Sequence, residues 1–378
     1  MVLRSVSISQ PKRDVIHRIR THAGSMPWRV AVEHGPRSVT HRELAGLVER
    51  RMLALAGSLR PGRYVAIEEA RSIEFVVEFL AVLALDGIPV PIDPGLPDRH
   101  RMLLRDLVRP DVLLAASTTD GAHVLFTSGM REPPRPVLGS ASALRAFLEW
   151  QCAEFGIESA DRVAFLSALG AEAAVRELFL PLWAGATLVI PAEGDDATPE
   201  SAVEWLRHRE ISVVNVRPSV ALSWLRTGAG PCESVRAVFF AGEPVTADLL
   251  REWHARFPGT RIAVNFYGTT DTTLPKVYKR LDGVAAPDGV LPVGRPVPNA
   301  RVVLIDPAHP LSAELVWAAW ENPSSEGEVV LVSRNSGHGY VGMPEETRAR
   351  FVDLGNGVTA FRTGDLGLLD ESGELTIK

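Results

Sequence analysis

Segments that favour helices alternate with short apolar runs along most of this chain, and that alternation limits the folds open to it. Residues 72–85 (SIEFVVEFLAVLAL) predict a buried helix, Asp86-Gly87 ends it, and residues 88–92 follow as a short strand. Strand–helix–strand units of this length favour parallel sheets that are covered by helices. We therefore expect an α/β protein built from stacked, helix-covered and mostly parallel sheets.

The same alternation continues toward the C-terminus. Thr246 is predicted to cap the N-terminus of a helix. Ligands in such folds gather at the carboxyl ends of strands, so the segments that follow strands are candidate binding loops. The remaining expected strands cover residues 123–126, 186–190, 213–216, 238–240 and 262–265, and the remaining expected helices cover 171–183 and 246–257.

The character of the sequence changes near residue 291, where short β segments separated by turns replace the alternation. Strands are expected over residues 302–305, 328–332 and 373–377, with an exposed loop at 321–327 (ENPSSEG). These segments suggest a smaller β-rich lobe. The expected organisation is an N-terminal tail (1–12), α/β lobes (13–290) and a β-rich lobe (291–378).

The composition excludes several classes of function. The chain has 378 residues, too many for one simple core, and its net charge of -6 with no run of lysine and arginine argues against nucleic acid. Cys152 and Cys232 are the two cysteines, too few for a disulfide framework or a cysteine-rich zinc site. Neither a membrane span nor a signal peptide is predicted, so we expect a cytoplasmic protein.

Three short stretches carry the strongest functional signal. Asn265-Phe-Tyr-Gly-Thr-Thr-Asp-Thr-Thr273 follows an expected strand, and Phe361-Arg-Thr-Gly-Asp-Leu366 lies further along. They resemble the Asn-x-Tyr-Gly-Pro-Thr-Glu and Tyr-Arg-Thr-Gly-Asp-Leu elements of adenylate-forming enzymes. Thr127-Ser-Gly129, after the strand at 123–126, resembles the start of their glycine-rich phosphate loop. In this order the stretches indicate a site for an adenosine phosphate.

The order of these elements resembles the adenylation domains of nonribosomal peptide synthetases, in a family that also includes acyl-CoA synthetases and luciferases. The likeness extends over nearly the whole chain, through residues 80–94, 239–243, 293–296 and 339–344. Family members continue into a small mobile C-terminal domain whose lysine assists adenylation, whereas this sequence stops at Lys378. The resemblance therefore implies the large N-terminal core, with the small domain either removed or on another chain.

The resemblance implies attack of a carboxylate on the α-phosphorus of ATP, with release of pyrophosphate. It also implies Mg²⁺, the phosphopantetheine thiol of a peptidyl carrier protein as acceptor, and neighbouring synthetase domains. Such a transfer depends mainly on positioning and on charge stabilisation. The chain must therefore hold the polyphosphate, the metal ion, the nucleoside and the acid.

The phosphate loop is present in an altered form. The family reads Thr-Ser-Gly-Ser-Thr-Gly-x-Pro-Lys-Gly, and residues 127–136 of this chain read Thr-Ser-Gly-Met-Arg-Glu-Pro-Pro-Arg-Pro. Prolines remove backbone donors and Glu132 repels phosphate, so an ordinary surface loop is an open alternative. The phosphate contacts implied by the resemblance belong to Thr127, Ser128, Gly129, Arg131 and Arg135.

The resemblance assigns the metal ion to Asp271, where the family has glutamate, because aspartate is also a hard-oxygen ligand. Tyr267 would stack on adenine, and Asp365 would accept hydrogen bonds from the ribose hydroxyls. Each residue also has a structural alternative: Asp271 could cap a loop, Tyr267 could be a core aromatic, and Asp365 could be a turn residue. The implied nucleotide site comprises Gly242, Asn265, Tyr267, Gly268, Thr270 and Asp365.

The acid would be oriented from residues 171–179 (AEAAVRELF), which align with the family's Phe-Asp-x-Ser-x-x-Glu-x-Phe. Glu172 stands where the family's aspartate pairs with a substrate α-amino group, and Arg176 follows at i+4. Such a pair can also form a salt bridge with itself on a solvated helix face. Phe239 and Phe266 would fill space, so a small or collapsed pocket is expected. The other pocket positions are Ala173, Asn215, Ala241, Leu274 and Pro275.

Two hypotheses from different classes follow. The first is an enzyme, the core of an adenylation domain that activates an amino acid or related carboxylic acid. The second is a degenerate adenylation-like domain that serves as a scaffold or binding module in an assembly line, and an acyl-CoA ligase comes third. The changes at residues 130–132, Thr269 and Asp271, together with the bulky pocket, favour the scaffold. The enzyme, which we expect, is favoured by the retained residues 127–129, 267–268 and 362–365.

Overall fold

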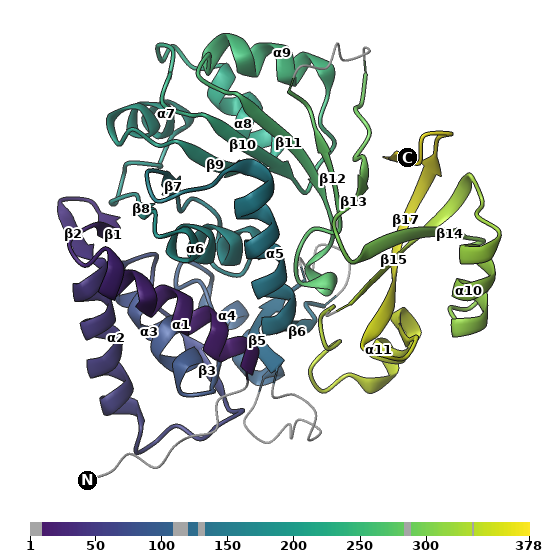
Figure 1. Cartoon of the computed structure of the whole chain (residues 1–378), viewed down its shortest axis with the longest axis horizontal. Coiled ribbons are helices and arrows are strands. Elements are labelled where there is room, and N and C mark those ends of the chain that lie inside the picture. Colours follow the sequence, from purple (N-terminus) through teal and green to yellow (C-terminus); the bar gives the residue numbers. More distant parts are fainter. Residues whose placement is uncertain (1–9, 109–119, 128–132, 283–288, 335) are drawn as a thin grey trace. The chain divides into compact units, whose positions relative to one another are not determined.

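The computed structural model describes residues 10–108, 120–127, 133–282, 289–334 and 336–378. The chain divides into two compact units, residues 1–193 with 340–342 and residues 194–339 with 343–378. Each unit combines strands with covering helices (Figure 1). The α/β class expected from the alternating sequence is therefore confirmed. Within the described ranges, no helix has both the length and the apolar character that crossing a membrane requires.

Helix α3 (Ile73–Ala84) is apolar, almost wholly buried and central to the helical part of the first unit. Ser72 caps it by accepting a hydrogen bond from the backbone N–H of Phe75 at 3.0 Å. Helices α1 (Gln10–Ser25) and α2 (His41–Leu55) pack against α3. The helix expected in this segment is therefore confirmed.

Helix α6 (Glu172–Ala184) is the element from which the acid was expected to be oriented. It ends at Gly185, whose φ of 73° is a left-handed conformation that glycine adopts readily. Helix α5 (Ala141–Phe155) and α1 both pack against α6. The sequence prediction of this helix is confirmed to within a residue at each end. Helix α4 (Asp98–Leu107) is a further helix of this unit.

The strands of the first unit form three groups. Strands β7, β8 and β1 are parallel, with β2 antiparallel at the edge, and β3 and β4 form a parallel pair. Strands β5 and β6 are antiparallel, because the short connection between them leaves no room for a helical crossover. The strand bounds are β1 Val30–His34, β2 Arg37–Thr40, β3 Tyr64–Ile67, β4 Ile88–Pro91, β5 Gly121–Phe126, β6 Pro136–Ser140, β7 Arg162–Ala164 and β8 Thr187–Ile190.

The second unit begins with alternating strands and helices. Strands β9, β10 and β11 are parallel, and β12 and β13 continue from β11 in antiparallel order. Helix α8 packs against both α7 and α9 (Figure 1). Thr246 caps α9 by accepting from the backbone N–H of Leu249 at 3.2 Å, as predicted. The bounds are α7 Pro199–His208, β9 Val213–Val216, α8 Pro218–Leu225, β10 Ala237–Ala241, α9 Ala247–Arg256, β11 Ile262–Tyr267, β12 Val277–Arg280 and β13 Arg295–Pro296.

A smaller antiparallel sheet forms the rest of the second unit, as the change in sequence character predicted. Its order is β14-β15-β17-β16, and β18 pairs with β17. Helix α10 packs on one face, where Val316 is buried against Val303, Val330 and Ala360. Residues 321–326 are exposed, in agreement with the expected loop, although β15 already begins there. The bounds are β14 Ala300–Ile305, α10 Ala313–Glu321, β15 Glu326–Arg334, α11 Pro344–Arg350, β16 Phe351–Asp353, β17 Val358–Leu369 and β18 Leu375–Ile377.

Candidate nucleotide-binding site

A cavity of about 270 Å³ in the second unit gathers most of the predicted nucleotide residues. It opens where β10 and β11 end, the position that the sequence predicted for a binding loop. Strand β17 contributes from the smaller sheet. Thr270 does not line the cavity and lies two residues after Gly268, which does. The predicted residues that line the cavity are Gly242, Asn265, Tyr267, Gly268 and Asp365.

Tyr267 and Asp365, the two residues predicted to hold the nucleoside, are joined by a hydrogen bond. The Tyr267 hydroxyl donates to Oδ2 of Asp365 at 2.7 Å. Burial raises the pKa of Tyr267, and the nearby charge of Asp365 raises it further, so the phenol stays protonated. The Tyr267 ring packs against an apolar cluster that includes Val277 and Leu331. The pair therefore connects the ends of two sheets at one wall of the cavity.

Asp365 stands in a bulge of strand β17. On strand β15, Glu328 lies opposite Leu366, whereas Val330 lies opposite Arg362, so the register shifts between these positions. The residues between Arg362 and Leu366 therefore leave the regular ladder. This bulge directs a carboxylate-bearing segment to the cavity wall instead of continuing the strand pairing.

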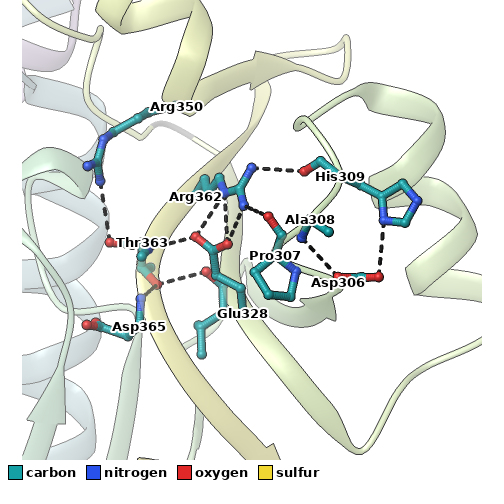
Figure 2. A network of polar contacts seen from close by, with 11 residues as sticks. Asp306, Pro307, Ala308, His309, Glu328, Arg350, Arg362, Thr363 and Asp365 are labelled. Carbon is teal, nitrogen blue, oxygen red and sulfur yellow. Dashed lines mark hydrogen bonds and ion pairs between the residues drawn. The ribbon is translucent and has the colours of Figure 1, made fainter.

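Glu328, on the neighbouring strand β15, holds the backbone of that bulge through its carboxylate (Figure 2). Its side chain is 6% exposed and accepts hydrogen bonds from the backbone N–H of Gly364 at 3.1 Å and from Nε of Arg362 at 2.9 Å. The hydrogen bond to Glu328 raises the pKa of Arg362, which therefore stays a cation. Arg362 also donates to the carbonyls of Pro307 and His309, at 2.7 and 2.9 Å. The guanidinium thus ties the bulge to a neighbouring turn.

Thr363 completes the support of Asp365. Its hydroxyl donates to the carbonyl of Val329 at 2.8 Å and accepts from the backbone N–H of Asp365 at 3.0 Å. Gly364 has a φ of 87°, which a residue with a side chain adopts only with strain. Each residue of the Arg-Thr-Gly-Asp segment therefore has an identifiable structural reason to be there.

Asn265 and Gly268 shape the other side of the cavity. Asn265 is 1% exposed, and its Nδ2 donates to the carbonyl of Pro292 at 3.1 Å, which holds the segment that lines the cavity there. A Cβ atom on Gly268 would lie 2.7 Å from Cα of Pro275, so only glycine allows this approach. Gly242 follows β10 with a φ of 85° and is exposed.

Asp271, the predicted metal ligand, lies in a short 3₁₀ turn (Thr270–Thr272). Within the described part of the chain, the buried hydroxyls of Thr269 and Thr273 have no hydrogen-bond partner. Thr273 has a φ of 74°, a conformation that β-branched residues avoid. The described residues contain no group of three or more His, Cys, Asp or Glu arranged for a metal ion. Carboxylate and hydroxyl oxygens suit Mg²⁺, which takes one or two carboxylates with phosphate oxygens, so this donor set fits that ion.

The predicted phosphate loop belongs to the first unit, and the structure describes its two ends. The Thr127 hydroxyl accepts from the backbone N–H of Arg135 at 2.9 Å, and the Thr127 backbone N–H donates to the Arg135 carbonyl at 3.0 Å. The Arg135 guanidinium lies over the ring of Tyr340, 5.4 Å from its centroid. Thr127 also lines a cavity of about 430 Å³. Ser128, Gly129 and Arg131 lie outside the described residues.

Glu172 and Arg176 form a salt bridge on α6, with 2.9 Å between Oε1 and Nε. The salt bridge that the i+4 spacing allows therefore forms, but the alternative that placed the pair on a solvated helix face is wrong. The Arg176 side chain is 0% exposed and that of Glu172 only 15%, because this side of α6 is buried. Glu177, not singled out from the sequence, accepts from the backbone N–H of Ser167 at 2.8 Å. Burial raises the pKa of Glu177 to about 7.

The predicted pocket residues of the second unit lie on its parallel strands. Phe239 and Phe266, on neighbouring strands, stack with 5.4 Å between ring centroids and an interplanar angle of 11°. Asn215 on β9 lies opposite Phe239 and is 3% exposed. Because the predicted acid pocket draws on both units, it stays a prediction. Leu274 and Pro275 are buried, whereas Ala173 and Ala241 are partly exposed.

Glu328 is the functional-site residue that sequence reasoning missed. It sits directly before the apolar run Val329–Val332, where a lone acid at the start of a buried strand requires a cation or several donors. That requirement was readable from the sequence. The donors that meet this requirement could not be identified from the sequence, because Arg362 and Gly364 lie on a strand that is distant in the chain.

The chain matches the AMP-binding enzyme family over residues 19–121 and 110–341. The AMB antimetabolite synthetase AmbB of Pseudomonas aeruginosa is 31% identical, over 99% of this chain and 32% of that protein. The isonitrile lipopeptide synthase of Streptomyces coeruleorubidus is 27% identical, over 99% of this chain and 27% of that protein. This chain therefore spans about a third or less of the length of these relatives.

Solved structures of the nonribosomal peptide synthetase FmoA3 share the fold. One superposes with a TM-score of 0.83 at 25% identity, over 98% of this chain and 44% of that chain. A form with AMPPNP bound has a TM-score of 0.82, and a form with α-methyl-L-serine-AMP bound has 0.81. The family match over most of the sequence and the likeness to AmbB together show that this chain is a member of the AMP-binding enzyme family.

Proposed function

We propose that this chain is the adenylation core of a nonribosomal peptide synthetase that uses ATP to activate an amino acid or a related carboxylic acid. The observation that carries the proposal is the hydrogen-bonded pair of Tyr267 and Asp365 at the wall of a cavity of about 270 Å³. Supporting it, structural relatives named nonribosomal peptide synthetases hold AMPPNP or an aminoacyl-type adenylate. These likenesses favour the enzyme over the scaffold hypothesis.

In this proposal the nucleoside binds in the second unit. Asp365 accepts hydrogen bonds from the ribose hydroxyls, and the Tyr267 ring provides an apolar face for adenine. Gly268 lets the backbone at Pro275 pack closely against it, which fixes the segment that follows Tyr267 at the cavity. Asp365 is held by its bulge, so little reorganisation is required when the nucleotide binds.

The phosphates are assigned to Thr127, Arg135 and Thr270, and the Mg²⁺ ion that accompanies them is assigned to Asp271. Asp271 would hold Mg²⁺, with the hydroxyls of Thr269 and Thr273 as further oxygen donors. When bound, Mg²⁺ neutralises charge on the phosphates. Arg135 supplies a fixed cation at the end of the phosphate loop, where its guanidinium is already ordered over Tyr340.

The acid is assigned to the segment that begins α6. Glu172 and Arg176 form an ion pair in a buried setting. The ammonium group of an amino acid would bind Glu172 in place of part of its contact with Arg176. The activated acid would then pass to the phosphopantetheine thiol of a peptidyl carrier protein. We assign further synthetase domains and a small C-terminal adenylation subdomain as partners, in a cytoplasmic assembly line for a secondary metabolite.

Acid-dependent exchange of pyrophosphate into ATP tests this function. We expect exchange with one amino acid or a related acid from a panel, and its loss in Asp271→Ala, which keeps a native circular-dichroism spectrum. Calorimetric titration with non-hydrolysable aminoacyl-sulfamoyl adenosines gives a second readout that requires no turnover. A chain that shows no exchange and binds neither ATP nor any of these analogues at millimolar concentration would contradict the proposal and favour a scaffold.

A further inference from the structure

The ribose-binding carboxylate of the proposed site is held by a group from another sheet. Tyr267 is the last residue of β11, whereas Asp365 lies in the bulge of β17. The hydrogen bond of 2.7 Å between them joins these two sheets at the cavity wall. Asp365 therefore has two independent supports, one for its backbone and one for its side chain.

The backbone support comes from the bulge itself. The backbone N–H of Asp365 donates to the Thr363 hydroxyl at 3.0 Å, and the preceding N–H, from Gly364, donates to Glu328 at 3.1 Å. These contacts leave the side-chain torsions of Asp365 unrestrained. The Tyr267 hydroxyl restrains them through Oδ2.

Tyr267 is itself a fixed point. Its ring packs against the apolar cluster that contains Val293, Leu304 and Val329, so the hydroxyl cannot follow a moving carboxylate. The carboxylate has about four acceptor positions on its two oxygens, and the phenol occupies one of them. Enough acceptor capacity is therefore left for two ribose hydroxyls.

We propose that the Tyr267 hydroxyl is a positioning group that orients the Asp365 carboxylate and thereby sets the preference of this site for nucleotides with an intact ribose. This inference rests on the proposed nucleotide site, and it separates the role of the hydroxyl from that of the ring. A correctly oriented carboxylate distinguishes ATP from 2′-deoxy-ATP and 3′-deoxy-ATP, because each analogue leaves one acceptor position unpaired.

Tyr267→Phe tests the inference, because it removes the hydroxyl and keeps the ring. Calorimetric titration in excess Mg²⁺ gives the dissociation constants for ATP, 2′-deoxy-ATP and 3′-deoxy-ATP. We expect Tyr267→Phe to weaken ATP binding about tenfold and both deoxy analogues by less, so that the discrimination ratio falls toward one. In an Asp365→Ala background, adding Tyr267→Phe should change neither affinity nor ratio, because the group it orients is gone.

Tyr64→Phe is the matched control. The Tyr64 hydroxyl is buried and has no hydrogen-bond partner within the described ranges, and the residue lies in the first unit, outside the nucleotide cavity. Its removal should leave all three affinities unchanged. Near-ultraviolet circular dichroism and the unfolding midpoint establish that each variant is folded.

The outcomes separate this inference from the proposed function. Unchanged ATP affinity and an unchanged ratio in folded Tyr267→Phe would overturn the positioning role alone, as would tighter binding, which would make the hydrogen bond an obstacle to ribose. A parent chain that binds none of the three nucleotides would overturn the proposed function and this inference with it.

Discussion

The two ends of the candidate nucleotide site are built in different ways. At the ribose end, Asp365 is supported by Tyr267, and its bulge by Glu328 and Thr363, through hydrogen bonds of 2.7 to 3.1 Å. At the metal end, around Asp271, two buried threonine hydroxyls have no partner among the described residues, and Thr273 has a φ of 74°. An unpartnered buried hydroxyl costs about 1–3 kcal/mol, and strained backbone costs a similar amount.

This difference indicates a division of labour within one site. At the ribose end, protein groups hold one another in place through hydrogen bonds, which limits the entropy lost when a nucleotide binds. The metal end stores unsatisfied polar groups and backbone strain, which are common where a charged ligand completes the structure. The comparison therefore predicts that mutations at the first end change stability and binding together, whereas mutations at the second change binding with little loss of stability.

The largest expected effect comes from breaking the ribose end at Glu328. Glu328→Ala leaves Arg362 and the Gly364 N–H without their acceptor, so we expect the free energy of unfolding to fall by about 3 kcal/mol. Urea denaturation measures this change. Glu326→Ala on the same strand is the control, because its pair with Lys378 is exposed and should be worth less than about 0.5 kcal/mol. Equal losses in both variants would contradict the assigned role of Glu328.

Asp271→Ala examines the metal end. We expect ATP affinity in the presence of Mg²⁺ to fall about tenfold or more, and affinity measured in a chelator to stay the same, because the carboxylate acts through the ion. Calorimetry with and without EDTA gives both values. A variant that loses affinity equally under the two conditions would show that Asp271 does not hold the metal.

Paired threonine-to-valine changes compare the two ends directly. The Thr363 hydroxyl has two partners, so Thr363→Val should lower the free energy of unfolding by about 1–3 kcal/mol. The Thr273 hydroxyl has none in the described part of the chain, so Thr273→Val should leave stability unchanged or raise it by about 1 kcal/mol. Chemical denaturation measures the free energy of unfolding of both variants. A decrease in Thr273→Val as large as that in Thr363→Val would contradict the difference proposed between the two ends.

The smallest expected effect concerns pH. Burial and the charge of Asp365 raise the pKa of Tyr267, so its hydroxyl donates throughout the usual assay range. Discrimination between ATP and its deoxy analogues should therefore be flat from about pH 6.5 to 9. Above about pH 10 tyrosine ionises in the unfolded chain before it does in the folded one, so Tyr267 should lower the free energy of unfolding as pH rises. A ratio that falls between pH 7 and 9 would contradict the assigned donor.

Local signals in the sequence predicted much of the fold. Thr246 caps its helix as predicted, because capping depends on residues within one turn, and the helix expected over residues 72–85 forms with Ser72 as its cap. Pairing partners were less accessible: strand β6 was not expected, because proline and glycine within Pro136–Ser140 disfavour strands, so its antiparallel pairing with β5 came from the structure alone. The spacing of Glu172 and Arg176 allowed for their salt bridge, but it left open whether that helix face is solvated or buried, because spacing on a helix does not report what packs against it.

In the candidate site, too, local sequence features were predictable and contacts between distant segments were not. Motif residues such as Asn265, Tyr267 and Asp365 were identified from the sequence, and the structure brings them to one cavity. The residue that supports Asp365, Glu328, could not be identified from the sequence, because it acts on a bulge that forms only when two distant strands pair. The left-handed backbone of Thr273 was equally hidden, since nothing about a threonine predicts a positive φ.

The most direct test of the account is calorimetric titration of the parent chain and Asp365→Ala with ATP and Mg²⁺. We predict saturable binding to the parent and a loss of affinity of tenfold or more in Asp365→Ala, with Tyr64→Phe unchanged. Binding that is equally tight in Asp365→Ala, or no binding to the parent at millimolar ATP, would contradict a nucleotide site built around Tyr267 and Asp365.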